Sequence, residues 1–167
     1  MSAIQIPTFL IKPVEDVNLN QLGEFLERQS LGYPEYEAWV RKTCLPELYF
    51  RQKRGICAIT NGTIVADIIF QNHEQLPGTL EIKNLRVHDG LRRTDIAHFL
   101  MKQAEGYAKQ AGCQQIIADF RAGKSYSSDL LTFLHFCGYQ VLFQTELYPD
   151  GIDYVVGKRL SSRSILV

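Results

Sequence analysis

The stretch that decides the fold runs from Leu80 to Tyr139. It reads LEIKNLRVHDGLRRTDIAHFLMKQAEGYAKQAG over residues 80–112, IIADF over 116–120 and SDLLTFLHFCGY over 128–139. Alternation with period two predicts a strand over 79–87. Apolar positions three or four apart predict a helix over 95–111, which Gly112 ends. A nearly continuous apolar run predicts a strand over 115–120 that is covered on both faces, and a second helix is expected over 129–137.

The apolar positions of the first of these strands change parity. Leu80 and Ile82 share one face, whereas Leu85 and Val87 have the other parity. A one-residue slip in a period-two pattern indicates a β-bulge near Lys83-Asn84, while a strand with mixed faces is the alternative reading. The pattern does not separate the two. A bulge would leave backbone N–H and C=O groups unpaired beyond the slip, where an extended ligand can dock.

The flanking segments complete the order of elements. Asn18 starts a predicted helix, and Pro34 suits the first turn of a second helix, which Pro46 stops or kinks. Asn61-Gly62 between two alternating runs predicts a hairpin. Further strands are expected at residues 8–11, 56–60, 63–70, 139–147 and 152–156, the last two joined by a turn at Pro149-Asp150-Gly151. The result is a mixed sheet with helices on its faces.

Length and composition bound the function. The 167 residues are 46% hydrophobic and carry 18 basic and 18 acidic side chains. We expect one domain over residues 1–160 and a loose tail over 161–167. Balanced charge argues against nucleic acid as a partner, because phosphate binding needs clustered cations. No apolar run reaches the roughly 20 residues that cross a bilayer, and no secretory signal is recognised, so we expect a cytoplasmic protein.

The cysteines and histidines do not indicate a metal site. The four cysteines lie in apolar stretches without CxxC spacing, and the four histidines are scattered. We expect buried thiols in a reducing compartment and no bound metal.

A short loop leads into the helix predicted over 95–111. It consists of Arg92, Arg93, Thr94, Asp95, Ile96 and Ala97. The first N–H groups of a helix have no partner within it, and the helix dipole favours an anion there. The loop is therefore a candidate anion site, although two solvated loop cations are the alternative reading of the arginines.

With these elements in place, the chain resembles the GNAT acetyltransferase family over residues 80–139. The family has a bulged fourth strand ending in valine, a loop of pattern (Gln/Arg)-x-x-Gly-x-(Gly/Ala) that opens a helix, then a strand, a short helix and a Gly-aromatic pair. The resemblance implies an α/β fold, with a mostly antiparallel mixed sheet of about seven strands splayed between strands four and five. It further implies acetyl transfer from acetyl-CoA to an amine, without a metal.

The resemblance also implies which residues hold acetyl-CoA. They are Leu85, Arg86 and Val87 on the strand, Arg92, Arg93, Thr94, Asp95, Ile96 and Ala97 in the loop, and Ser127 before the short helix. Three positions depart from the family: Asp95 replaces the central glycine, Ser127 a common asparagine, and Leu134 a tyrosine that often serves as general acid. Because leucine cannot give a proton, a non-catalytic domain that senses CoA or binds proteins is the alternative function.

Catalytic roles are likewise implied by the resemblance. Glu81, six residues before Val87, stands where some family members place the glutamate that deprotonates the amine. A solvent-facing strand carboxylate is the alternative. For the acid we select Tyr126, in the loop before the short helix, ahead of His135 and Tyr139; solvent can also serve.

The acceptor is a small-molecule or protein amine that the sequence does not specify. In the family, the segment between the first two helices shapes the acceptor pocket. Here Glu35 and Glu37 could receive a cationic amine, whereas the alternative reading makes Tyr36 and Trp39 core residues and leaves the glutamates solvated. Pairing of exposed edge strands is the basis for expecting a homodimer through the final strands.

Overall fold

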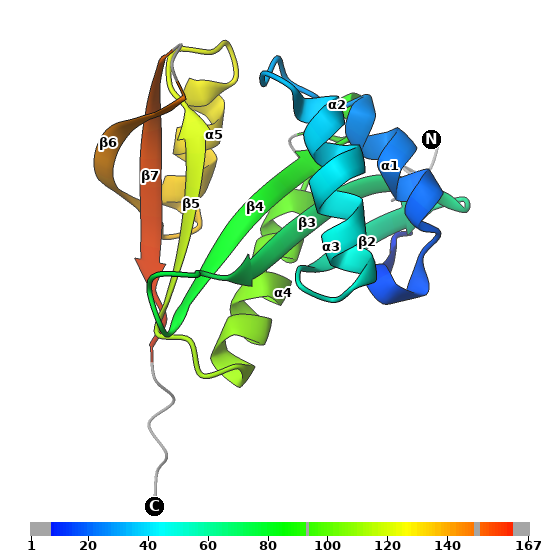
Figure 1. The fold of residues 1–167 in the computed structure, drawn as a ribbon, viewed down its shortest axis with the longest axis horizontal. Coiled ribbons are helices and arrows are strands. Elements are labelled where there is room, and N and C mark those ends of the chain that lie inside the picture. Colours follow the sequence, from blue (N-terminus) through cyan, green and yellow to red (C-terminus); the bar gives the residue numbers. More distant parts are fainter. Residues whose placement is uncertain (1–7, 93, 149–150, 162–167) are drawn as a thin grey trace, which may run out of the picture. The chain divides into compact units, whose positions relative to one another are not determined.

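The computed structural model describes residues 8–92, 94–148 and 151–161. These residues form a seven-stranded sheet in the order β1-β2-β3-β4-β5-β7-β6 (Figure 1). The strands are β1 (Leu10–Pro13), β2 (Arg54–Thr60), β3 (Thr63–Asn72), β4 (Thr79–Val87), β5 (Gln115–Arg121), β6 (Gln140–Tyr148) and β7 (Gly151–Arg159). The helices are α1 (Leu19–Glu27), α2 (Tyr36–Trp39), α3 (Leu45–Tyr49), α4 (Ile96–Gln110) and α5 (Ser127–Phe136), with short turns η1 (Val14–Asp16), η2 (Val40–Cys44) and η3 (Asp89–Leu91). The predicted order of elements is confirmed.

The chain divides into two compact units. The first comprises Met1–Ile69 and Asn84–Leu100, and the second comprises Phe70–Lys83 and Met101–Val167. Strands β3 and β4 and helix α4 each contribute residues to both units. The expectation of one domain over residues 1–160 stays a prediction.

In the first unit, local signals in the sequence form the elements they predict. Asn61 and Gly62 have φ of 49° and 75° and join β2 to β3. Two successive left-handed residues match the twist of a hairpin, which is why Asn-Gly favours this turn. The side chain of Asn18 accepts hydrogen bonds from the backbone N–H groups of Asn20 and Gln21, and so caps α1.

Proline does not stop the second predicted helix. Pro46 lies within the helical segment formed by α2, η2 and α3. η2 is a wide π-type turn, in which the backbone N–H of Leu45 donates to the carbonyl of Val40. Because proline lacks an N–H and crowds the preceding turn, a widened turn just before it lets the helix continue.

The core of the first unit lies between helices α1–α3 and the strands beside them (Figure 1). Its buried members include Leu22, Leu26, Val40, Cys44, Cys57 and Ile69. Burial raises the pKa of the Cys44 thiol to about 12. Cys57 and Cys137 are also buried and Cys113 is half-buried, so all but one of these thiols lie where they were predicted.

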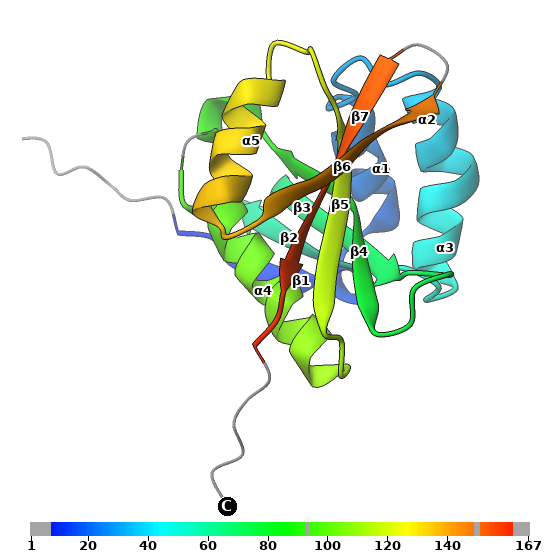
Figure 2. The ribbon, with the colours of Figure 1, turned by 90° about the vertical axis from the view of Figure 1, so that its left-hand side faces the viewer.

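In the second unit, β5 pairs with β7 along its whole length, from Gln115↔Arg159 to Arg121↔Asp153. Ile116 and Phe120 on β5 are buried. Strand β6 pairs with β7 and forms the edge of the sheet (Figure 2). The turn predicted at Pro149-Asp150-Gly151 and the tail predicted over 161–167 fall largely outside the described residues.

The described part of the chain lacks two features. None of its helices is long and apolar enough to cross a membrane. It also holds no group of three or more His, Cys, Asp or Glu side chains placed to bind a metal ion.

Candidate active site

The ladder between β4 and β5 is short. The two strands pair in parallel from Thr79↔Gln115 to Ile82↔Ala118, whereas β4 continues to Val87. The last residues of β4 therefore have no recorded ladder partner in β5. Backbone N–H and C=O groups outside a ladder are available to an extended ligand.

Side-chain contacts locate the parity change in β4. Gln71 Nε2 donates to Glu81 Oε2 at 3.2 Å, and Asn84 Nδ2 donates to Asp67 Oδ2 at 2.8 Å. Gln71 and Asp67 lie four residues apart on β3 and so share a face. Glu81 and Asn84 contact that face although they have opposite parity. β4 therefore carries one extra residue between them, which confirms the bulge predicted near Lys83.

Backbone hydrogen bonds at the two ends of β4 agree with this bulge. The N–H of His73 donates to the carbonyl of Thr79 at 2.9 Å, and the N–H of His88 donates to the carbonyl of Val65 at 2.8 Å. From Thr79 to His88 is nine residue steps (79 to 88), whereas from Val65 to His73 is eight (65 to 73). The extra residue therefore lies on the β4 side.

The loop into α4 is exposed and braced by its own polar groups. Arg92 forms an ion pair with Asp89 at 2.7 Å. The hydroxyl of Thr94 donates to the carbonyl of Leu91 at 2.6 Å. Arg93 lies outside the described residues. The loop between β4 and α4 thus holds an exposed cation, while its threonine hydroxyl is engaged.

The first residues of α4 leave mainly backbone for a ligand. Asp95 is exposed, and its carbonyl accepts the hydrogen bond from the N–H of Phe99 that opens the helix. The Ile96 side chain is buried and Ala97 is half-buried. Any phosphate contact at Ile96 must therefore come from its N–H group.

Ser127 uses its hydroxyl inside the protein. Its Oγ donates to the carbonyl of Arg121 at 2.7 Å and accepts from the N–H of Lys124 at 2.9 Å. Ser127 is the first residue of α5, and Tyr126 occupies the cap position. The buried hydroxyl closes the turn between β5 and α5.

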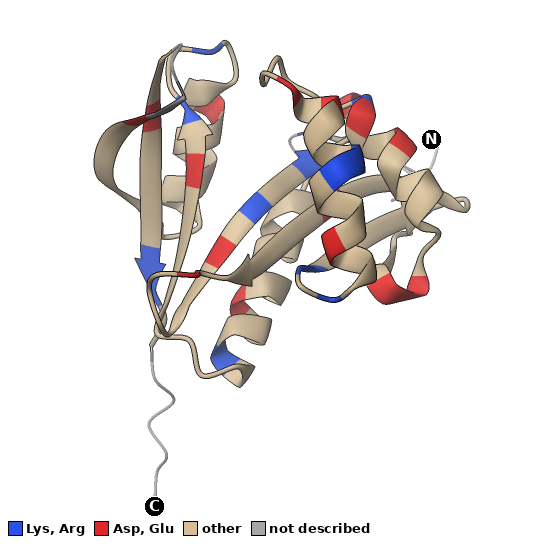
Figure 3. Ribbon diagram, viewed as in Figure 1, with Lys and Arg blue, Asp and Glu red and all other residues tan. Residues whose placement is uncertain are grey.

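Glu81 is not a solvent-facing carboxylate. Its side chain is 16% exposed, and both oxygens are engaged: Oε1 accepts from Lys83 Nζ at 3.0 Å and Oε2 accepts from Gln71. Figure 3 shows acidic and basic residues following one another along β4. The carboxylate is thus held by a cation on its own strand.

The three tyrosine and histidine candidates for the acid differ in exposure. Tyr126 is half-buried with a buried hydroxyl. Tyr139 is 1% exposed, and burial raises its pKa. His135 is exposed on α5, next to the buried Leu134. Tyr139 therefore belongs to the core, and its phenol is a poor donor.

A second carboxylate beside Glu81, that of Asp119, was not predicted from the sequence. Asp119 on β5 is half-buried, and burial raises the pKa of its carboxyl, with Lys83 opposing and Glu81 adding to the shift. The positive charge of Lys83 therefore acts on both Glu81 and Asp119. The signal was available, because Asp119 is the only charged residue in the apolar run 116–120.

A third carboxylate, Asp67 on β3, was also missed. It is fully buried, and burial raises its pKa to about 7. Like Asp119, it interrupts an apolar strand, here the run 64–70. A charged residue inside a buried strand is costly unless it is paired, so both aspartates mark places where packing alone does not explain the sequence.

The start of α2 and the residue before it contribute to both core and surface. Tyr36 is 7% exposed and lies in the core cluster, against which Trp39 packs. Glu35 and Glu37 are exposed. The alternative that placed the two aromatics in the core is confirmed.

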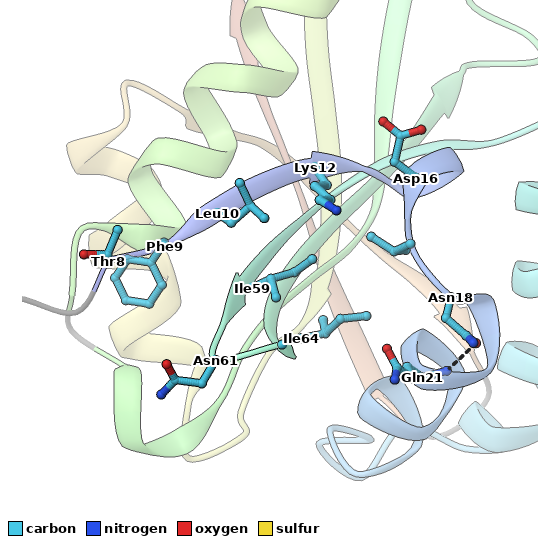
Figure 4. Close-up of a pocket in the computed structure, with 12 residues that line it drawn as sticks. Thr8, Phe9, Leu10, Lys12, Asp16, Asn18, Gln21, Ile59, Asn61 and Ile64 are labelled. Atoms are coloured by element: carbon cyan, nitrogen blue, oxygen red, sulfur yellow. Dashed lines mark hydrogen bonds between the residues drawn. The ribbon is translucent and has the colours of Figure 1, made fainter.

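A pocket of about 430 Å³ opens elsewhere in the first unit (Figure 4). It is lined by β1, the residues around Asn18 and the hairpin at Asn61, with Lys12 beside Ile59. None of its lining residues belongs to β4 or to the loop into α4. This pocket is therefore separate from the candidate site.

The match to a family model shows to which protein family the chain belongs. The model of the acetyltransferase (GNAT) family matches residues 19–131, which include β4, the loop and α4. The chain belongs to the GNAT acetyltransferase family. No match was found among curated proteins.

Solved structures share the GNAT fold at low sequence identity. A putative GNAT acetyltransferase from Desulfovibrio desulfuricans has a TM-score of 0.77 at 12% identity, over 92% of this chain and 100% of that one. The PaiA N-acetyltransferase from Thermoplasma acidophilum, solved with coenzyme A, has 0.68 at 17%, over 92% and 99%. A Bacillus subtilis acetyltransferase in complex with CoA has 0.67 at 15%, over 92% and 100%. The fold predicted from the sequence is confirmed.

Proposed function

We propose that this GNAT protein transfers an acetyl group from acetyl-CoA to the amino group of a small molecule or protein. The observation that carries the proposal is the end of β4. There the strand bulges, continues beyond its ladder with β5 and leads through an exposed loop into α4. Family membership gives the reaction class, and coenzyme A bound to structural neighbours supports the choice of co-substrate.

The first unit carries the residues proposed to hold acetyl-CoA. The backbone of Leu85–Val87 would bind the extended part of the molecule. The N–H groups of residues 94–97 and the side chains of Arg92 and Arg93 would bind its phosphates. Arg92 can turn to a phosphate because its ion pair with Asp89 is exposed and therefore weak.

The reaction needs one base and one acid. The amine nitrogen attacks the thioester carbonyl carbon, a C–N bond forms, the C–S bond breaks, and the amine proton passes to a base. The leaving thiolate takes a proton from an acid, for which we propose Tyr126. The backbone N–H near Val87 would polarise the thioester carbonyl.

Two carboxylates of the second unit are candidates for the base. Glu81 is the residue that the family resemblance implies, and it is bonded to Lys83. Burial raises the pKa of Asp119, and the positive charge of Lys83 only partly offsets this shift. A carboxyl with a raised pKa is better matched to accepting a proton near neutral pH.

The co-substrate is tested by thermal unfolding. Saturation at 100 times the dissociation constant stabilises a protein by about 2.7 kcal/mol, or roughly 2–4 °C for a domain of this size. We expect this shift with acetyl-CoA and a smaller one with adenosine diphosphate. Release of free thiol in the presence of a panel of primary amines then measures transfer. Absence of any shift at millimolar acetyl-CoA would favour the non-catalytic module.

The base is assigned by comparing two variants. If Asp119 accepts the proton, Asp119→Asn lowers kcat by at least about 100-fold and removes the acidic limb of the kcat profile. Glu81→Gln is the matched comparison. If Glu81 is the base, turnover falls at neutral pH more than the affinity for acetyl-CoA changes. An equal loss of turnover and affinity would assign either residue a structural role.

Asp95 places a negative charge where phosphates are proposed to bind. Two unit charges about 4 Å apart interact by about 1 kcal/mol in water and about 4 kcal/mol at an effective dielectric of 20. We therefore expect Asp95→Gly to tighten acetyl-CoA binding, measured by calorimetry. Unchanged or weaker binding contradicts the proposed phosphate position.

Location and assembly are proposed on separate grounds. We expect a cytoplasmic protein with free thiols. Edge strand β6 exposes Leu142 and Phe143, at 53% and 55%, which supports pairing with a second copy. Light scattering on the purified protein tests the dimer, and a charge at Phe143 should dissociate it.

A further inference from the structure

A chain of buried polar groups crosses the first unit behind the β4 bulge. The hydroxyl of Tyr36 donates to Asn84 Oδ1 at 3.1 Å, and Asn84 Nδ2 donates to Asp67 Oδ2 at 2.8 Å. Their exposed fractions are 7%, 3% and 0%. Each of the three comes from a different element: α2, β4 and β3. We call this trio the Asn84 clamp.

Burying the polar groups of the Asn84 clamp has a desolvation cost. Asp67 Oδ1 has no hydrogen-bond partner in the described part of the chain. Among the described residues, the charge of Arg86 lowers the pKa of Asp67 and so opposes the effect of burial, while Cys44 and Cys57, which also interact with Asp67, are buried thiols. An apolar residue here would avoid this desolvation cost. Stability alone therefore does not account for an aspartate at this position.

The Asn84 clamp holds the side chain of Asn84 in one orientation at the β-bulge of β4. An asparagine amide has one accepting and one donating end, and here both ends are held by buried partners. Rotation of the side chain would break at least one of these hydrogen bonds. The Cα of Asn84 is therefore held against β3 and α2, at the place where β4 has its extra residue.

Arg86 holds the peptide group between Leu85 and Arg86. Its Nη1 donates to the carbonyl of Leu85 at 3.0 Å and its Nε to the carbonyl of Gln29 at 2.9 Å. The guanidinium lies 5.2 Å from the ring centre of Tyr36 and 5.6 Å from that of Tyr33. The Leu85 carbonyl is thus satisfied from within the first unit, which sets the orientation of the peptide between Leu85 and Arg86.

We propose that Asn84 and Arg86 are positioning residues that hold the bulged end of β4 in the shape required to bind acetyl-CoA through its backbone. Asp67 and Tyr36 act through Asn84. This inference rests on the proposed function, because it concerns the backbone groups of Leu85–Val87 other than the Leu85 carbonyl, which Arg86 occupies.

The test measures CoA affinity by calorimetry and needs no acceptor. We expect Asn84→Ala to weaken CoA binding by at least about tenfold, and Tyr36→Phe and Asp67→Asn by about threefold each. Leu48→Ala is the matched control, because Leu48 is buried in the same unit outside the clamp. The control should lower the melting temperature while the CoA affinity stays within about twofold.

A double-mutant cycle separates positioning from general loosening. If Tyr36 acts through Asn84, adding Tyr36→Phe to Asn84→Ala brings no further loss of CoA affinity. If Asn84→Ala does not fold, the milder Tyr36→Phe and Asp67→Asn variants carry the test. Arg86→Lys should weaken CoA binding relative to the wild-type protein, because the lysine ammonium cannot donate to two carbonyl groups with the fixed geometry of a guanidinium.

Three outcomes overturn the inference. In the first, the wild-type protein binds CoA and the clamp variants bind it equally well, which leaves the proposed function intact. In the second, the clamp variants and Leu48→Ala lose affinity in proportion to their stability. In the third, the wild-type protein binds no CoA, and then the proposed function fails together with the clamp.

Discussion

Two fully buried aspartates, one in each unit, are stabilised in different ways. In the second unit, Asp153 Oδ1 accepts from Arg121 Nε at 3.0 Å, so a cation neutralises the carboxylate. In the first unit, Asp67 accepts from the neutral amide of Asn84. Within the described residues, each carboxylate keeps one oxygen without a hydrogen-bond partner. The difference therefore lies in the charge of the partner.

This difference separates a structural pair from a candidate functional one. Arg121 and Asp153 are directly opposite each other on β5 and β7, so their ion pair joins two neighbouring strands. Asp67 instead holds Asn84, at the bulge that shapes the end of β4. A buried carboxylate whose hydrogen-bond partner is a neutral amide is costly, and a further task for that hydrogen bond would explain why it is kept.

The largest effect is expected from breaking the ion pair. Arg121→Met leaves Asp153 as an uncompensated buried charge, and we expect the free energy of unfolding to fall by about 3–5 kcal/mol. Urea denaturation measures this. Replacing both residues, Arg121→Met with Asp153→Leu, should recover most of the loss. A loss below about 1 kcal/mol for the single variant would show that the pair is not a structural requirement.

The next effect concerns the pH dependence of stability. The pKa of Asp67 is raised from 3.8 to about 7, so between these values the folded state binds more protons than the unfolded state. This contribution makes stability fall as pH rises from about 4 to 7, by at most about 1.4 kcal/mol per pH unit, and stay constant above. Asp67→Asn should remove that slope. Identical pH profiles for the two proteins would contradict the raised pKa.

The smallest effect is expected from the hydroxyl of Tyr36. Tyr36→Phe removes one hydrogen bond and leaves Asn84 Oδ1 without its donor, so the free energy of unfolding should fall by about 1 kcal/mol. Tyr107→Phe is a suitable control, because the recorded contact of Tyr107 is through its ring, with Phe70. If the two variants lose the same stability, the hydroxyl of Tyr36 contributes nothing specific.

Much of the fold could be predicted because its signals are local. Asn61-Gly62 specifies a hairpin turn through the φ values of two adjacent residues, and Asn18 caps α1 through bonds two and three residues away. The bulge was predicted from a change of parity within a single strand. Of the two effects expected at Pro46, a stop is wrong, because the helical segment continues through a wide turn just before the proline.

The candidate site was predicted less completely than the fold. The family pattern indicated Glu81 but not its bonds to Gln71 and Lys83, which require β3 and β4 to be paired. Asp119 could have been found, since it is a lone charge in an apolar run, but its neighbours come from another strand. Ser127 had the right position in the sequence, while its hydroxyl is engaged with the turn around it.

Local patterns in the amino-acid sequence specify the order of strands and helices along the chain, the hairpin turn and the cap of α1, and they indicate a change of parity in β4. Each of these depends on interactions between residues a few positions apart. Only the tertiary structure decided that Asn84 is held by Tyr36 and Asp67, which are 48 and 17 positions away. Such contacts leave no periodic pattern in the chain, because they form only after α2, β3 and β4 have packed together.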